Sequence, residues 1–168
     1  MKLYIAGKVS KNSVFGMHHW RDNFVDELAK LSRLELSHLD PLAYETGEYD
    51  PQKVFDKDCW LINQVDCVVV YLSDDISVGG SQEMLIAKYL KKPLIGFAPL
   101  GGKFNMAEKE FMGQIIKDYV DPFVHASCDM VCASVEEVAG ALSDIGAIEP
   151  KTMQLVDNAI DRAASELV

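Results

Sequence analysis

The sequence predicts a three-layer α/β domain in which helices cover both faces of a five-stranded, mainly parallel sheet. Apolar strand-like runs alternate with amphipathic segments along the chain, which is the pattern of successive strand–helix units. The run CVVVYL at 67–72 is continuous, apolar and rich in β-branched residues, as central strands of buried parallel sheets are. A length of 168 residues suits one domain with its own core. Together these observations favour a flavodoxin/Rossmann-like arrangement with an extra C-terminal helix.

Five segments are predicted to form strands, and we expect the first and the third to be neighbours. They are 2–6, 34–39, 67–72, 93–98 and 129–133. In sheets of this kind the ligand site lies at the carboxyl ends of the strands, near the point where the strand order reverses. GKVSKN at 7–12 follows the first strand and SDDISVGGSQE at 73–83 follows the third, so we expect functional residues in these two segments.

Helices are predicted between the strands in the first half of the chain. Apolar residues at helical spacing indicate the first one: Trp20, Phe24, Leu28 and Leu31. Asp50-Pro51 is a typical helix start, because Asp can cap the helix and Pro fits its first position. That second helix should end near Asn63, and a third is expected over 81–91.

The second half of the chain is predicted to hold three more helices. Residues 106–119 follow a Gly-rich loop at 98–105 and place apolar side chains on one stripe: Phe111, Ile115 and Tyr119. Ser134 and Glu137 have the spacing of a capping box that opens the next helix. The tail has an apolar face that needs a surface to cover: Val156, Ile160, Ala163 and Leu167. We therefore expect an α/β domain at 1–148 and a C-terminal helix at 149–168 that packs on it or on a neighbouring subunit.

Composition excludes several classes of function. The net charge of −10 argues against a nucleic-acid polymer or an anionic membrane as partner. The apolar part of the N-terminal segment is too short for a signal peptide, and no stretch approaches the length of a membrane span. Four cysteines without a CxxC pair are expected to be reduced core residues in the cytoplasm. His18 and His19 are adjacent and point to different sides of a helix, so we expect no metal site.

Glu83 stands out because no basic residue lies beside it at the start of the predicted 81–91 helix. Gly79 and Gly80 would let the backbone turn tightly and approach a ligand. Ser81 is a plausible N-cap, which would put Glu83 in the first helical turn, where the helix dipole favours a carboxylate. A surface cap and a nucleophile would both be ionised there, so position alone leaves both interpretations open.

Neighbouring residues can distinguish the two interpretations. Tyr4 lies near the carboxyl end of the first strand and could reach the segment that carries Glu83. Asp58 lies on the helix before the third strand, and Asp66 opens that strand. Taken singly, Tyr4 could be a core aromatic residue, Asp58 a solvated helix residue and Asp66 a turn residue.

Three segments, LYIAG, DCWLINQVDCVVVYLSD and SVGGSQE, resemble the nucleoside 2-deoxyribosyltransferase superfamily, which includes the deoxyribonucleoside 5′-monophosphate N-hydrolases. The resemblance runs from residue 2 to about residue 97. It depends on three spacings: Tyr-x-x-Gly in the first strand, Asp58 eight residues before Asp66, and Glu83 seventeen residues after Asp66. The last twenty residues have no counterpart in the resemblance.

The resemblance implies a role for each matching residue. Glu83 matches the nucleophile, which attacks the anomeric carbon and forms a covalent glycosyl-enzyme in a two-displacement mechanism. Tyr4 matches the tyrosine that holds this nucleophile through its hydroxyl group. Asp58 matches the aspartate that binds the nucleobase and shares in proton transfer. Asp66 matches in spacing, and we interpret it as structural.

The resemblance leaves transferase and hydrolase activities open. Ser77 stands where many transferases carry an aspartate and where a serine of the monophosphate hydrolases contacts the 5′-phosphate. The basic loop GKVSKN offers donors for a phosphate, namely Lys8, Ser10, Lys11 and Asn12, although an ordinary solvated loop would read the same. This loop matches the Gly/Ser/Arg-rich loop of the hydrolases poorly, however. Further candidates for substrate binding are Gly7, Gly79, Gly80 and Ser81. KFNMA at 103–107 is faintly similar to the segment that transferases lend to a neighbouring subunit's site, which makes Asn105 a further candidate.

We therefore expect a transferase of deoxyribosyl groups between nucleobases, with a nucleotide N-hydrolase as the alternative. A non-catalytic nucleotide sensor and a flavodoxin-like redox protein are further possibilities, the latter disfavoured by the lack of a Thr/Ser-rich phosphate loop. The partners expected are a small nucleoside or nucleotide and further copies of the chain, in a dimer or a larger homo-oligomer. No cofactor is expected.

Overall fold

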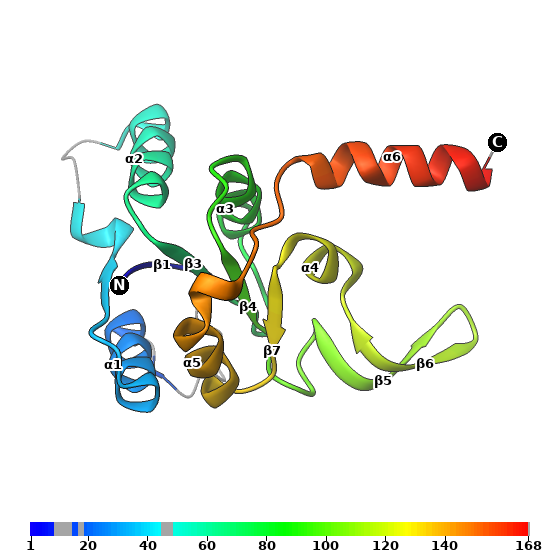
Figure 1. Cartoon of the computed structure of the whole chain (residues 1–168), viewed down its shortest axis with the longest axis horizontal. Coiled ribbons are helices and arrows are strands. Elements are labelled where there is room, and N and C mark those ends of the chain that lie inside the picture. The colour runs from blue at the N-terminus through cyan, green and yellow to red at the C-terminus, as the bar shows by residue number, and fades with distance from the viewer. Residues whose placement is uncertain (9–14, 17–18, 45–48, 168) are drawn as a thin grey trace.

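The protein has a five-stranded sheet with helices on both faces, as Figure 1 shows for the computed structural model, which describes residues 1–8, 15–16, 19–44 and 49–167. The strand order is β2-β1-β3-β4-β7, and every neighbouring pair is parallel. The strands are β1 (Lys2–Ala6), β2 (Ser37–Leu39), β3 (Cys67–Tyr71), β4 (Leu94–Phe97) and β7 (Met130–Cys132). The predicted fold class is confirmed, and so is the pairing of the first and third strands.

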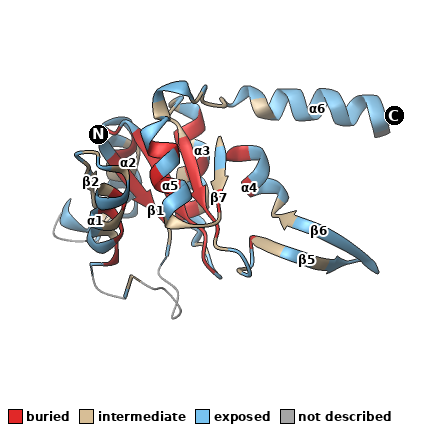
Figure 2. Ribbon diagram, turned by 60° about the horizontal axis from the view of Figure 1, so that its bottom comes forward, coloured by how far each residue is buried: buried red, intermediate tan, exposed pale blue. Residues whose placement is uncertain are grey.

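Two apolar cores lie on opposite faces of the sheet (Figure 2). One packs beneath α1 (Trp20–Ser32) and α5 (Val135–Ser143). The other packs beneath α2 (Pro51–Asn63), α3 (Val78–Tyr89) and the short α4 (Pro122–Ser127), a helix that the sequence analysis did not predict. Since side chains of a strand alternate between faces, Leu3 and Ile5 join the first core, and Tyr4 joins the second, next to α2 and α3.

The predicted helix over 106–119 is wrong. Strands β5 (Asn105–Phe111) and β6 (Gln114–Val120) form an antiparallel hairpin there, separate from the main sheet. Its turn has positive φ at Met112 (51°) and Gly113 (78°), as a type I′ hairpin turn requires. Phe111 and Ile115 lie on opposite strands near this turn and are 57% and 68% exposed, so their helix-like spacing corresponds to no buried stripe.

The remaining short elements are η1 (Pro41–Tyr44) and η2 (Ile145–Ala147), and α6 (Gln154–Leu167) ends the chain. Helix α6 is the predicted amphipathic tail, and it extends away from the sheet with its surface largely exposed (Figures 1 and 2). Its apolar face borders a cleft of about 660 Å³ whose other walls are α3 and α4. Within the described part of the chain, no helix combines the length and the apolarity needed to cross a bilayer.

Candidate active site

The centre of the site is a hydrogen bond between two residues 79 positions apart in the sequence. Tyr4 Oη donates to Glu83 Oε1 over 2.9 Å. Tyr4 is fully buried on β1, and burial raises the pKa of its hydroxyl far above the ordinary value, with the charges of Glu83 and Asp58 adding to the effect. The hydroxyl therefore stays protonated and remains a donor to the Glu83 carboxylate.

Glu83 lies in the second turn of α3, which corrects the expectation that it lies in the first. The N-cap is Ser77 and not Ser81: the Ser77 hydroxyl accepts from Gly80 N at 3.0 Å, and the helix begins at Val78. Ser81 instead donates its hydroxyl to Val78 O at 2.8 Å. The helix dipole acts mainly within the first turn, so it contributes less to the ionisation of Glu83 than the sequence suggested.

The surroundings of Glu83 have opposing effects on the pKa of its carboxyl group. Burial raises the pKa of its half-buried carboxyl group, and the nearby charge of Asp58 raises it further. The hydrogen bond from Tyr4 and the charge of Arg21 lower the pKa. A carboxylate in such a place is poorly solvated yet held by one donor. These surroundings suit a nucleophile better than they suit a surface cap.

Gly79 and Gly80 belong to the first turn of α3 and not to the loop before it, contrary to expectation. The chain turns earlier, between β3 and Ser77. A Cβ at Gly80 would come within 3.0 Å of Ile76 Cγ1, whereas one at Gly79 would approach only the Ser77 hydroxyl, at 3.8 Å. Gly80 thus lets this loop pack closely against the start of the helix.

Asp58 lies on α2, and its Oδ1 atom is buried without a hydrogen-bond partner among the residues that the structure describes. Burial raises the pKa of the Asp58 carboxyl, while Lys57 and Arg21 lower it. Its charge acts on both Tyr4 and Glu83. A buried carboxyl oxygen without a partner is costly, and a bound ligand that offers a donor would remove this cost.

Gly7 directly follows β1 and has a conformation that a larger residue could not adopt. Its φ is +121°, and a Cβ there would lie 2.6 Å from the Tyr71 carbonyl oxygen of the neighbouring strand. The close approach of β1 and β3 at this edge therefore requires glycine. Asp66 lies at the opposite end of the same two strands, where its Oδ2 accepts a hydrogen bond from Lys2 N at 2.7 Å. This contact agrees with a structural role for Asp66.

Arg21 is a residue of this site that the sequence analysis missed. Its Nε donates to Ile5 O at 3.0 Å, and its Nη2 donates to Gly7 O at 3.1 Å. The guanidinium also lies over the Trp20 ring, 4.6 Å from the ring centroid. The one signal in the sequence is its place in the first turn of the helix after β1, because such a turn lies near the carboxyl edge of the sheet.

Lys8 joins the two segments in which functional residues were expected. Its Nζ pairs with Asp75 Oδ2 at 3.0 Å, and both side chains are exposed. This hydrogen bond lowers the pKa of the Asp75 carboxyl group. Lys8 thus places a positive charge beside the loop that leads to Ser77. Ser10, Lys11 and Asn12 of the same predicted loop lie outside the described residues.

Asn105 is not brought to the Tyr4–Glu83 pair by any contact described for it. It opens β5, and its Nδ2 donates to Ala98 O at 2.9 Å, which closes the loop between β4 and the hairpin. Its role at a site therefore remains a prediction, and it would have to act on another chain or on a ligand that reaches the hairpin.

A cleft of about 580 Å³ lies beside Arg21, between the start of α1 and the end of β2. In it Asp22 bridges two histidines, with Oδ2 3.3 Å from His19 Nδ1 and Oδ1 3.2 Å from His38 Nε2. Across the described ranges, no group of three or more His, Cys, Asp or Glu side chains could hold a metal ion. His18 lies outside those ranges.

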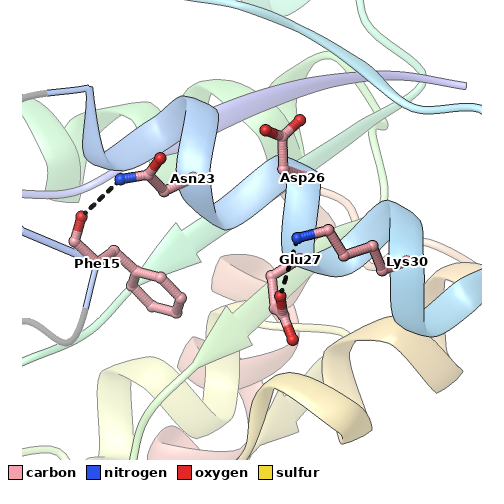
Figure 3. Close-up of a pocket in the computed structure, with 5 residues that line it drawn as sticks. All are labelled: Phe15, Asn23, Asp26, Glu27 and Lys30. Carbon is pink, nitrogen blue, oxygen red and sulfur yellow. Dashed lines mark hydrogen bonds and ion pairs between the residues drawn. The ribbon is translucent and has the colours of Figure 1, made fainter.

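A second hollow, of about 490 Å³, lies on the outer side of α1 (Figure 3). It is bordered by Asn23, which donates to Phe15 O at 3.1 Å, and by the Lys30–Glu27 pair at 3.6 Å. None of its lining residues belongs to the Tyr4–Glu83–Asp58 cluster. This hollow is a groove between surface side chains and contributes nothing to the candidate site.

Comparison with solved structures identifies relatives of the fold. A conserved protein from Enterococcus faecalis aligns with a TM-score of 0.57 and 16% identity, over 83% of this chain and 94% of that one. A 2-desoxiribosyltransferase from Leishmania mexicana aligns with a TM-score of 0.52 and 20% identity, over 84% of this chain and 95% of that one. A CMP N-glycosidase from Clostridium botulinum has a TM-score of 0.45 and 15% identity over 84% and 97% of the two chains.

The sequence itself matches no protein-family model, and no curated protein matches it. At identities of 16% and 20%, the first two structural alignments establish a shared fold. The chain therefore has the α/β fold of a 2-deoxyribosyltransferase, as its resemblance to that superfamily implied.

Proposed function

We propose that this chain belongs to the nucleoside 2-deoxyribosyltransferase superfamily and transfers a deoxyribosyl group from one nucleobase to another. The observation that carries the proposal is the hydrogen bond from Tyr4 Oη to Glu83 Oε1 at the carboxyl edge of the sheet. Asp58 acts on both groups, and its buried Oδ1 has no hydrogen-bond partner in the part of the chain that the structure describes. A structural cap has no use for a buried phenol donor, whereas a nucleophile must be held in one orientation.

In the first step, the Glu83 carboxylate attacks C1′ of the sugar and a C–O bond forms. The C1′–N bond breaks, and its electron pair leaves with the base. Asp58 delivers a proton to that base from its protonated form, which its raised pKa makes easier to reach. The transition state resembles an oxocarbenium ion, and the product is a glycosyl ester of Glu83.

In the second step, a nitrogen of the incoming base attacks C1′ from the face that the first base left. Glu83 departs as a carboxylate, and Asp58 takes the proton that the incoming base loses. Two displacements at one carbon retain its configuration. Tyr4 donates to Glu83 whenever the carboxylate is free, which aligns it for each attack.

Hydrolysis of nucleoside 5′-monophosphates is the second candidate, in which water takes the place of the incoming base. It is favoured by Lys8, which holds a positive charge beside the loop before Ser77, and by Ser77 at the N-terminus of α3. A phosphate there would compete with Asp75 for Lys8 and would lie near the first backbone N–H groups of the helix.

The experiment that tests the proposal is incubation with each deoxynucleoside and each 5′-monophosphate, with and without a second free base, followed by chromatography. Base exchange without the phosphate supports the transferase, and base release from the monophosphate alone supports the hydrolase. Glu83→Gln keeps the size and the acceptor for Tyr4 and should abolish both reactions, while the exposed control Glu110→Gln should leave them unchanged. Binding without base release, or full turnover by Glu83→Gln, would contradict a covalent mechanism.

A further inference from the structure

The carboxyl end of β1 extends beyond the strand beside it. The last residue of β1 paired with β2 is Tyr4, opposite Leu39. Alternate carbonyl groups of an extended strand point to opposite edges: Met1 O accepts from Ser37 N of β2 at 3.0 Å, and Lys2 O accepts from Asp66 N beside β3 at 2.8 Å. The carbonyls of Ile5 and Gly7 therefore face the edge where β2 has already ended.

Arg21 fills this vacant edge. Its Nε and Nη2 reach the Ile5 and Gly7 carbonyl oxygens at 3.0 and 3.1 Å, so one guanidinium replaces the two donors that a longer β2 would supply. The planar fork of arginine fixes both bonds at once, which the single ammonium of lysine cannot do. Contact with the Trp20 ring fixes the guanidinium further.

The same guanidinium supplies positive charge beside the two carboxyl groups of the cluster, Glu83 and Asp58. The groups around Glu83 are Tyr4 on β1, Asp58 on α2 and Arg21 on α1, and Lys57 acts on Asp58 from the same helix. Among the described residues, Arg21 forms no ion pair with either carboxylate within 4.0 Å. Its influence on Glu83 thus comes from a fixed position and not from direct pairing.

We propose that Arg21 is a positioning residue: held by the Ile5 and Gly7 carbonyl oxygens, it orders the strand end that carries Tyr4 and offsets the charges of Glu83 and Asp58. The inference rests on the proposed role of Glu83 as nucleophile. It assigns two separable tasks to one side chain, because the hydrogen-bonding fork orders β1 while the charge acts on Glu83.

Two substitutions separate these tasks. Arg21→Gln removes the charge and leaves one amide donor, whereas Arg21→Lys keeps the charge and loses the fork. Arg162→Gln on the exposed helix α6 is the matched control. Two readouts need no substrate: the pH midpoint of the Glu83 side-chain carboxyl carbon by ¹³C NMR, assigned with Glu83→Gln, and amide hydrogen exchange along β1.

Arg21→Gln should move the Glu83 midpoint to higher pH, because the charge that lowers this pKa is gone, and should speed exchange at the end of β1. Arg21→Lys should return the midpoint toward that of the wild type while exchange stays fast. In an active enzyme Arg21→Lys should lower kcat by about 100-fold, as a misplaced reactive group does, with little change in KM.

The proposal would be overturned if Arg21→Gln left both the pH midpoint of Glu83 and the amide hydrogen exchange along β1 unchanged. If that variant does not fold, Arg21→Lys carries the test, and wild-type exchange in it would overturn the proposal instead. A shifted midpoint in a protein that cleaves no nucleoside would leave the positioning role intact and reject the proposed function, so the two failures are distinguishable.

Discussion

The carboxyl group of Glu83 is held between a donor, Tyr4, and a like charge, Asp58. Burial and Asp58 both raise its pKa, so the folded protein binds a proton at Glu83 more readily than the unfolded chain does. The stability linked to this group is fully present below its unfolded pKa and is lost as pH rises through the folded pKa. Keeping Glu83 ionised for chemistry therefore costs folding free energy at neutral pH, as is common for functional carboxylates.

Tyr4→Phe should slow the proposed reaction and shift its pH dependence. The hydrogen bond from Tyr4 lowers the pKa of Glu83, so its loss raises that pKa and moves the acid limb of kcat/KM to higher pH. A hydrogen bond to a charged group contributes about 1.5–3 kcal/mol, which corresponds to a rate loss of roughly 10- to 100-fold. The measurement is the pH profile of kcat/KM.

The matched control for this change is Tyr89→Phe, an exposed tyrosine on the same helix as Glu83. Phenylalanine fills the volume of Tyr4, so the melting temperature should stay near that of the wild type. An unchanged pH profile would show that the hydrogen bond does not govern Glu83. An unfolded variant would show that Tyr4 serves mainly the core.

At the scale of elements, the site depends on how β1 and β3 end side by side. Gly7 brings the end of β1 against Tyr71 O, and Arg21 occupies the edge that β2 leaves. Helix α3 begins at Val78 under the cap of Ser77, which sets the turn on which Glu83 lies. A shift of one residue in that start would rotate Glu83 away from Tyr4, since successive helical residues lie about 100° apart.

Gly7→Ala should destabilise the fold by about 1–3 kcal/mol or more, because strain at positive φ adds to a steric clash with Tyr71 O. Gly101→Ala is the control, since Gly101 also has positive φ (+88°) but has no atom within 4 Å of the added Cβ. The difference between the two free energies of unfolding in urea isolates the clash. Equal losses would mean that the approach of β1 to β3 is not what requires glycine.

Across the whole molecule, one buried ion pair joins α3, β4, β7 and the segment that leads to α6. Lys88 Nζ donates to Asp129 Oδ2, and both side chains are almost fully buried. Asp129 also accepts from Leu94 N and Lys151 N, each at 2.7 Å. Lys151 Nζ in turn donates to Cys128 O at 2.6 Å. This network anchors the base of the C-terminal helix to the sheet.

Asp129→Asn should destabilise the protein by about 3–5 kcal/mol, because it leaves the Lys88 ammonium buried without its counter-charge. The matched comparison is Asp75→Asn, which breaks the exposed pair with Lys8 and should change stability far less, because water already screens that pair. Both values come from urea unfolding. A loss for Asp129→Asn as small as that for Asp75→Asn would contradict the proposed anchor.

Self-association is the expectation that concerns the molecule as a whole. Helix α6 exposes Val156 and Ile160 beside the apolar cleft that it forms with α3 and α4, and burying this face would release ordered water. Light scattering should give a mass above the 18.7 kDa of one chain, and Ile160→Glu should lower it. Asp161→Glu is the control on the polar face. A wild-type monomer at micromolar concentration would contradict this expectation.

The features that depend on local pattern were predictable from the amino-acid sequence. The apolar run at 67–72 and the alternation of strands and helices were sufficient for the parallel sheet, because a strand covered on both faces must be apolar on both. The spacing of Tyr4, Asp58 and Glu83 was sufficient to bring out the candidate cluster, because strands β1 and β3 pair in the expected way.

Three features became visible only in the folded chain. Arg21 belongs to the site because β2 ends early, and strand length relative to a neighbour is not a local property. The hairpin β5–β6 replaced a helix because Met112 and Gly113 adopt positive φ, whereas apolar spacing at 106–119 fits both structures. Glu83 lies in the second turn, and not in the first, because the N-cap of α3 is Ser77. The place of Arg21 thus depends on contacts between separate elements, whereas the hairpin turn and the Ser77 cap are short-range contacts that apolar spacing does not register.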